Sequence, residues 1–207
     1  KGISCYASKL LAKGEKIDKS LVSFVENSLF MTLTNVNFDP ESHMDMLRRS
    51  QVKKEEIRKK ALGENVTSKE ALYNLSDTKE QILEDAKKAG VMYDQDLDAD
   101  IRSVRETIKY GLKGIAAYAH QARFIKYQSD EVDDFYFISL AVLTDDSLKL
   151  NDLIGYLVKT GEMSVKVMEV LDKANNEKYN SPTPTRVNVN IKKGPFIVVS
   201  GDRKSTR

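Results

Sequence analysis

One cysteine and two histidines are the residues of this sequence with the widest chemical range. The thiol of Cys5 could act as a nucleophile or a metal ligand, and the imidazoles of His43 and His120 could transfer protons or bind a metal. A lone cysteine cannot form an internal disulfide, and zinc or an iron–sulfur cluster usually takes about four protein ligands. Neither histidine has the spacing of a Glu-x-x-His di-iron site. The sequence therefore predicts no catalytic, cofactor-binding or metal residue in this chain.

The surroundings of these residues along the chain favour packing over chemistry. Cys5 lies between Ile3 and Tyr6 on an expected helix, with no neighbouring histidine or second cysteine to activate the thiol. We interpret it as a small packed residue. No acidic orienter is apparent for His43 or His120, so we expect exposed or half-buried side chains rather than bases.

Two acidic pairs and one glycine-bounded run are the remaining candidates. Asp133-Asp134 follows an expected helix start, where the helix dipole favours anions, and Asp145-Asp146 begins an expected loop. Gly194-Pro195 precedes a short apolar run that could lead into a ligand loop. Its glycine spacing matches neither a phosphate-binding loop nor a dinucleotide fingerprint. We therefore assign none of these segments to catalysis or binding.

Composition excludes two classes of partner. The 207 residues are 41% hydrophobic, and 33 Lys and Arg stand against 31 Asp and Glu. The formal net charge of +2 provides no field to attract nucleic acid or an anionic membrane. No segment has the ~20 consecutive apolar residues of a membrane span, and the first residues do not resemble a secretory signal. We predict a cytoplasmic protein without nucleic-acid or membrane partners.

Apolar spacing is helical along almost the whole chain, which predicts an all-α fold. In residues 98–126 apolar side chains recur every three or four positions, and this stripe is the signature of a long amphipathic helix. Helix starts are expected at Asp39-Pro40, Thr67 to Glu70, Asp77 to Glu80 and Ser129, and helix ends near Gly63 and Gly90.

The chain also repeats itself. Lys1–Ala7 matches Lys113–Ala119 at five of seven positions, and Leu33–Asn35 resembles Leu143–Asp145. This order predicts two related three-helix bundles from an internal duplication, joined by a charged helical hairpin. Chance similarity between amphipathic helices stays as an alternative. The expected divisions are 1–62 and 98–176 for the two three-helix units, 63–97 for the charged connector and 177–207 for an extended tail.

The tail differs from the rest in its pattern. Val187–Ile191 alternates, and Gly194–Gly201 is a short apolar run bounded by glycines, as in the first buried strand of an α/β domain. The chain starts as though inside a helix and finishes in the basic residues 202–207. We expect both ends to be cut edges of a longer protein.

Several short segments within residues 1–201 resemble the sequences of the hybrid cluster protein family, the hydroxylamine reductases. The most specific are Asp100–Glu106 and Tyr110–His120, which are similar to the family's long helix. Others follow in the family's order: Phe30–Pro40, Thr144–Leu148, Gly161-Glu162, Leu171–Asn175 and Pro184–Asn188. The resemblance implies a helical domain followed by two α/β domains, which are the partners expected to be missing here.

The resemblance also implies an iron–sulfur cubane and a hybrid iron–sulfur–oxygen cluster in the parent protein, which reduces hydroxylamine to ammonia in nitrosative-stress or nitric oxide chemistry. The cubane cysteines of the family would precede Lys1. The family's strand ends in Ser-Gly-His, whose histidine binds the hybrid cluster, whereas here Ser200-Gly201 is followed by Asp202. We therefore expect no cofactor on this chain and no activity from it alone.

Three hypotheses follow. The first is a helical scaffold portion of a hydroxylamine reductase, which in the parent contributes to the wall of the active site and to an oligomer surface. The second is a stand-alone helical module for protein–protein contacts, and a second copy of the chain is one partner left open. The third is an enzyme acting through Cys5 or the acidic pairs, so the sequence leaves enzymatic activity of the chain itself uncertain.

Overall fold

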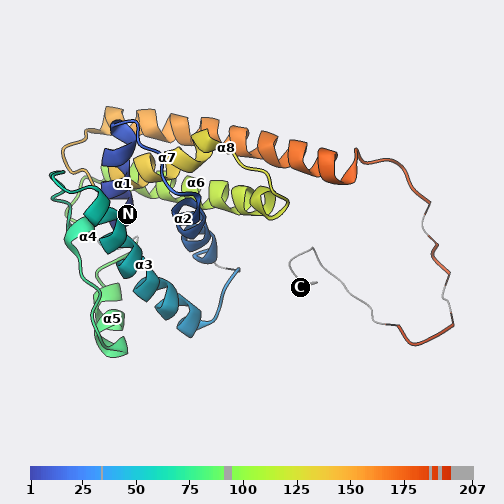
Figure 1. The fold of residues 1–207 in the computed structure, drawn as a ribbon, viewed down its shortest axis with the longest axis horizontal. Helices are drawn as coiled ribbons and strands as arrows, with labels where there is room; N and C mark the ends of the chain where they lie inside the picture. Colours follow the sequence, from blue (N-terminus) through green and yellow to red (C-terminus); the bar gives the residue numbers. More distant parts are fainter. Residues whose placement is uncertain (34, 91–94, 187, 191–192, 197–207) are drawn as a thin grey trace.

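The computed structural model describes residues 1–33, 35–90, 95–186, 188–190 and 193–196, which form eight α-helices and no strand within these ranges (Figure 1). The helices are α1 (Gly2–Ala12), α2 (Lys19–Met31), α3 (Pro40–Lys60), α4 (Lys69–Leu72), α5 (Lys79–Ala86), α6 (Ala99–Phe124), α7 (Asp130–Val142) and α8 (Leu150–Tyr179). The all-α prediction is confirmed for this part of the chain. None of its helices is long and apolar enough to cross a membrane.

The two longest helices, α6 and α8, lie side by side and form the spine of the molecule (Figure 1). The apolar stripe predicted in 98–126 is the buried face of α6, where Ile108 and Leu112 are fully buried. Gly111 permits the close approach of α8, because a Cβ atom there would lie 2.5 Å from Cγ2 of Thr160. The packing of α6 against α8 thus depends on both the apolar stripe and the small size of Gly111.

The shorter helices complete the core by packing across the chain rather than with their nearest neighbours. The main contacts of α1 are with α7, and those of α2 are with α6. Tyr136 and Phe137 of α7 are fully buried, as is Val22 of α2. One hydrophobic cluster therefore joins the beginning of the chain to residues more than a hundred positions later.

Of the four predicted helix starts, those at Asp39 and Ser129 agree with the structure and the other two are shifted. The carboxylate of Asp39 accepts hydrogen bonds from the backbone N–H groups of Glu41, at 3.1 Å, and Ser42, at 3.2 Å, so the predicted cap of α3 is confirmed. The capping boxes expected at Thr67 and Asp77 are wrong by one residue. The cap positions are Ser68 and Thr78, and only Thr78 accepts a bond from the helix backbone.

The charged connector contains two short helices, α4 and α5, separated by residues 73–78. Ser76 and Asp77 favour turns, which agrees with the end of α4 after a single turn at Leu72. In α5 Ile82 is buried, but Leu83 is 54% exposed. In Figure 1 this helix lies at the edge of the molecule, beyond the packed helices.

Helix α8 continues to Tyr179, so it includes the first three residues of the expected tail, 177–179. The described tail residues then form neither helix nor strand and run away from the helices (Figure 1). Most of the predicted strand in 194–201, with Asp202 and the basic residues 202–207, lies outside the described residues, as do Val187 and Ile191 of the alternating segment and Thr34 of the second repeat.

Candidate functional site

Cys5 lies at a cavity of about 760 Å³ that is bordered by α1, the segment before α4, α6 and the end of α7. Its side chain is buried, in keeping with a packing role. The Sγ atom lies 3.2 Å from Oγ of Ser68 and 3.2 Å from Oγ1 of Thr144. Two hydroxyl groups, from segments far apart in sequence, therefore surround the thiol, and no described histidine or second cysteine lies there to activate it.

Several charged side chains along this cavity are paired with one another. Nη1 of Arg105 lies 2.9 Å from the carboxylate of Asp146, and Nη2 donates to the carbonyl oxygen of Asp145 at 2.6 Å. The carboxylate of Asp145 accepts hydrogen bonds from the hydroxyl and backbone N–H of Ser147, and these bonds lower its pKa. Asp145 and Asp146, in the loop after α7, thus form hydrogen bonds and an ion pair, and a loop was predicted there.

The histidines contact different parts of the fold. The Nδ1 atom of His120 lies 2.9 Å from Oδ1 of Asn27, and its ring stacks on Phe30 with ring centroids 4.4 Å apart. The Nε2 atom of His43 lies 3.2 Å from the carbonyl oxygen of Asn37. Both side chains are half-buried, as predicted, and they join α2 to α6 and the start of α3 to the preceding loop.

The structure contains a buried ion cluster that sequence reasoning missed. The guanidinium of Arg123 on α6 donates to Glu26 of α2, at 3.0 and 3.1 Å, and to Asp133 of α7, at 2.7 Å. Lys19 extends the cluster, with its Nζ atom 3.0 Å from Asp133 and 2.5 Å from Asp130. The first of the two residues in Asp133-Asp134 therefore joins three helices, a role beyond the dipole effect that we predicted for it.

Desolvation dominates the electrostatics of this cluster. Burial raises the pKa of Glu26, although the hydrogen bonds and charge of Arg123 act in the opposite direction. Burial, followed by the charges of Glu26 and Asp133, raises the pKa of Tyr136 well above its ordinary value. The hydroxyl of Tyr136 and Oε1 of Glu26 are both buried without a hydrogen-bond partner. These properties describe a costly structural contact rather than a reactive acid exposed to substrate.

The described residues do not fit an iron–sulfur cluster. Cys5 is the only cysteine of the sequence, and its nearest polar atoms are hydroxyl groups. Within the described ranges no three His, Cys, Asp or Glu side chains come together as a metal site would require. The absence of metal ligands and catalytic residues from the whole chain stays a prediction.

The fold and cavities thus define an all-helical domain whose buried polar groups mainly join helices. Its sequence matches the Prismane/CO dehydrogenase family over residues 1–205. The chain belongs to that family, and the resemblance seen in its sequence is confirmed.

Curated relatives in this family are named hydroxylamine reductase. One from Acetivibrio thermocellus is 42% identical over 177 residues, which cover 86% of this chain and 32% of the relative. One from Natranaerobius thermophilus is 36% identical, with 97% of this chain and 37% of the relative covered. One from Desulfovibrio desulfuricans is 35% identical, with 97% and 36% covered. The chain spans about a third of the length of the curated relatives it matches.

Proposed function

We propose that this chain is the helical scaffold portion of a hydroxylamine reductase of the hybrid cluster type. The observation that carries this proposal is the alignment with relatives of that name, which covers 97% of this chain but 37% of the relative. The fold supports it, because the long helices α6 and α8 and the ion cluster at Arg123 give a rigid framework.

The reaction of the proposed parent breaks the N–O bond of hydroxylamine and uses two electrons and two protons to yield ammonia and water. The iron–sulfur clusters implied by the family would supply the electrons. The residues that the structure describes do not fit those clusters, so we assign no step of the reduction to them. Their proposed contribution is to form part of the wall of the active site and to support the α/β domains.

The proposed scaffold is an internal duplication in which α2 corresponds to α7, and α3 to α8. The repeat Lys1–Ala7 and Lys113–Ala119 equates α1 with the second half of α6. The helix contacts support this proposal. If α1 corresponds to α6 and α2 to α7, the contact of α1 with α7 should have a counterpart between α6 and α2, and both contacts are present. In this arrangement the units are interleaved, and the ion cluster joins helices of both.

The proposed partners are the α/β domains of the parent and a second copy of the protein, and the proposed location is the cytoplasm.

A chimera tests the scaffold role. Residues 1–201 of this chain would replace the matching third of the Acetivibrio thermocellus relative, which keeps its own residues from the position of Asp202 onward. We expect the chimera to retain iron, sulfide and hydroxylamine reduction, since the replaced segment is 42% identical where it aligns. A colourless, inactive but folded chimera would contradict the proposal.

The chain alone provides the matched experiment. We expect the purified chain to bind neither iron nor sulfide after reconstitution and to form no ammonia from hydroxylamine, with the intact relative as positive control. Stoichiometric iron that survives in the variant Cys5→Ala would show ligands other than this thiol. Turnover by the chain alone would refute a purely structural role.

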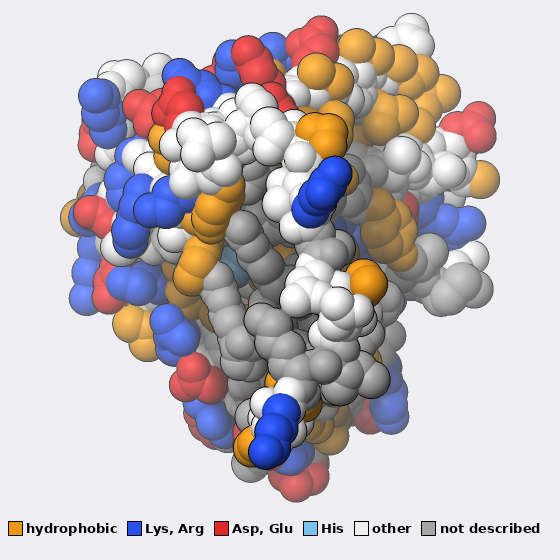
Figure 2. Space-filling view, turned by 90° about the vertical axis from the view of Figure 1, so that its right-hand side faces the viewer, with side chains coloured by type: hydrophobic (Ala, Val, Ile, Leu, Met, Phe, Trp, Pro, Cys, Tyr) orange, Lys and Arg blue, Asp and Glu red, His pale blue; other side chains and the backbone are white. Residues whose placement is uncertain are grey.

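A stand-alone interaction module is the second candidate, and an apolar stripe on α8 favours it. Ile154, Val158, Val165 and Met168 are exposed at helical spacing on one side of this helix. Figure 2 shows hydrophobic side chains gathered at the upper right of the molecule, at the height where Figure 1 places α8. Self-association in sedimentation that is abolished by Val165→Lys would show that this stripe is a contact surface, and an inactive chimera would then favour this candidate over the scaffold.

A further inference from the structure

A second cavity, of about 420 Å³, lies between α1, α2, α3 and α6. Its walls are largely apolar, with Phe24, Val25 and Leu29 from α2, Leu47 from α3 and Leu140 from α7. Volumes of roughly 300–1,000 Å³ with apolar walls and a few polar groups are typical of small-molecule sites. The polar groups of this cavity therefore decide which ligand it could accept.

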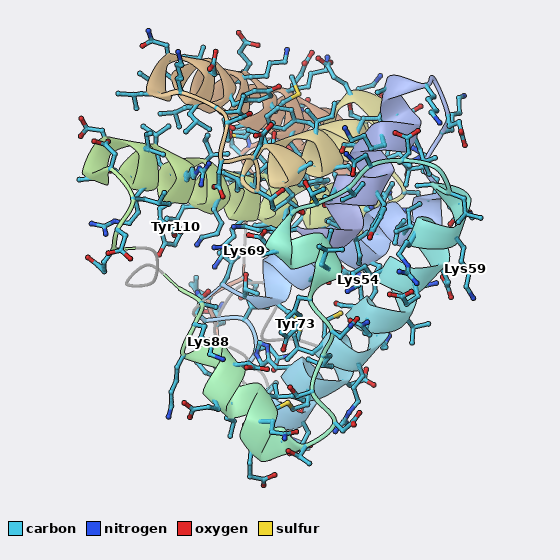
Figure 3. All side chains as sticks on the ribbon, turned by 90° about the vertical axis from the view of Figure 1, so that its left-hand side faces the viewer. Lys54, Lys59, Lys69, Tyr73, Lys88 and Tyr110 are labelled. Atoms are coloured by element: carbon cyan, nitrogen blue, oxygen red, sulfur yellow. The ribbon has the colours of Figure 1, made fainter. Side chains whose placement is uncertain are left out.

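Lys54 is the most unusual of these polar groups. Its side chain is only 5% exposed, and its Nζ atom donates a hydrogen bond to the carbonyl oxygen of Tyr73 (Figure 3). No carboxylate of the described residues forms an ion pair with it. Burial lowers its pKa. A buried ammonium without an anionic partner is unfavourable, and a bound anion would offset that cost.

Two further groups of the same cavity lack strong partners. Nζ of Lys113 lies 3.5 Å from the carbonyl oxygen of Thr32 and 5.5 Å from the ring centroid of Tyr110, and burial lowers its pKa. The hydroxyl of Ser4, a fully buried residue in the cavity lining, has no hydrogen-bond partner. The lining of the cavity thus includes an unused hydrogen-bonding group and two amines without carboxylate partners.

The other charges of the lining are already paired. Glu70 is the single acid among the described lining residues, and its carboxylate lies 3.6 Å from Nζ of Lys1. Lys109 forms an ion pair with Glu106 at 2.5 Å. The lysine side chains left without a carboxylate partner in the described lining are therefore those of Lys54 and Lys113.

We infer that this cavity binds a small organic carboxylate with an apolar body. Its carboxylate forms an ion pair with Lys54, while Lys113 contributes positive charge and Ser4 can donate a hydrogen bond. Its apolar body lies against the side chains of α2 and Leu47. A carboxylate suits the site better than phosphate, because the apolar walls offer few donors for further oxygens. This site is independent of the scaffold function proposed above.

Calorimetric titration of the chain with hexanoate and with neutral hexanamide tests the inference. We expect hexanoate to bind at least about tenfold more tightly, since a charge-assisted hydrogen bond is worth a tenfold change or more. The variant Lys54→Met should weaken hexanoate binding by at least about tenfold and should raise the Tm of the free protein, because an unpaired buried charge is removed. The rise in Tm separates lost binding from unfolding.

Lys59→Met is the matched control, because Lys59 is an exposed lysine toward the end of the same helix (Figure 3). It should leave the affinity for hexanoate unchanged. Equal binding of hexanoate and hexanamide, or an unchanged affinity in Lys54→Met, would overturn the ion pair. Tighter binding of inorganic phosphate would overturn the carboxylate, and no binding of hexanoate at millimolar concentration would overturn the site itself.

Discussion

Two charged regions of this molecule use the same residue types under opposite conditions. At the junction of α2, α6 and α7, the side chains of Glu26, Arg123 and Asp133 are 0%, 18% and 2% exposed. In the connector, Lys79 of α5 lies 2.6 Å from Glu41 of α3, and both side chains are largely in water. Solvent screens the second contact but not the first. Exposure rather than distance therefore decides which ion pair the fold depends on.

The largest effect should follow from Arg123→Met, which leaves the carboxylates of Glu26 and Asp133 buried without their shared partner. Removing one member of a buried ion cluster costs about 3–5 kcal/mol. We expect the free energy of unfolding, measured by urea denaturation, to fall by that amount.

The triple variant Glu26→Gln, Asp133→Asn, Arg123→Met tests the cause of this loss. It removes the stranded charges and should recover much of the stability. If Arg123→Met alone proved neutral, the cluster would be as dispensable as the pairs of the connector, and the contrast between the two regions would fail.

Two leucines give a matched comparison without charge. Leu112 of α6 is fully buried, and Leu83 of α5 is 54% exposed. We expect Leu112→Ala to lower the free energy of unfolding by about 2–5 kcal/mol, since it loses apolar burial and leaves a cavity. Leu83→Ala should change it by less than about 0.5 kcal/mol. Equal losses in urea denaturation would show that α5 packs as firmly as the spine.

Sequence pattern predicted the helices well because each pattern acts locally. The stripe of 98–126 corresponds to α6 (Ala99–Phe124), and the start expected at Ser129 corresponds to α7. Asp39-Pro40 marks the start of α3, since a cap needs only the next two backbone N–H groups. The starts of α4 and α5 were each misplaced by one residue, because neighbouring Ser and Thr side chains offer alternative caps.

The ion cluster could not be predicted because its members lie on three different helices. A signal was nevertheless present: Glu26 follows Val22 by one helical turn, and Arg123 follows Ala119 by one turn, so each charge lies on an apolar stripe. A charge on a buried face needs a partner. The sequence shows that need, but only packing shows that Arg123 meets both carboxylates.

The pH dependence of stability should reveal the effect of burying Glu26 in the cluster. Burial raises the pKa of Glu26, so the folded chain keeps this proton to a higher pH than the unfolded chain. The stability that the folded chain gains from holding this proton is fully present below the ordinary pKa of a glutamate. It is lost as the pH rises through the raised pKa of Glu26. We expect Glu26→Gln to gain stability relative to the wild type across that window.

The comparison is made by urea denaturation of both proteins at several pH values. Because Arg123, Asp133 and Lys19 are shared, their titration largely cancels in the difference. A difference that shrinks as the pH rises would mean that the ion pair with Arg123 outweighs burial at Glu26.

The smallest effect is expected at the exposed pair of the connector. The hydrogen bond to Glu41 raises the pKa of Lys79, but both side chains are hydrated and gain little from the contact. Lys79→Ala should therefore leave the urea midpoint unchanged and should at most speed amide hydrogen exchange in α5, while exchange in α6 stays slow. A clear fall in the midpoint would show that α5 is held to α3 through this pair, and the two charged regions would then differ in degree rather than in kind.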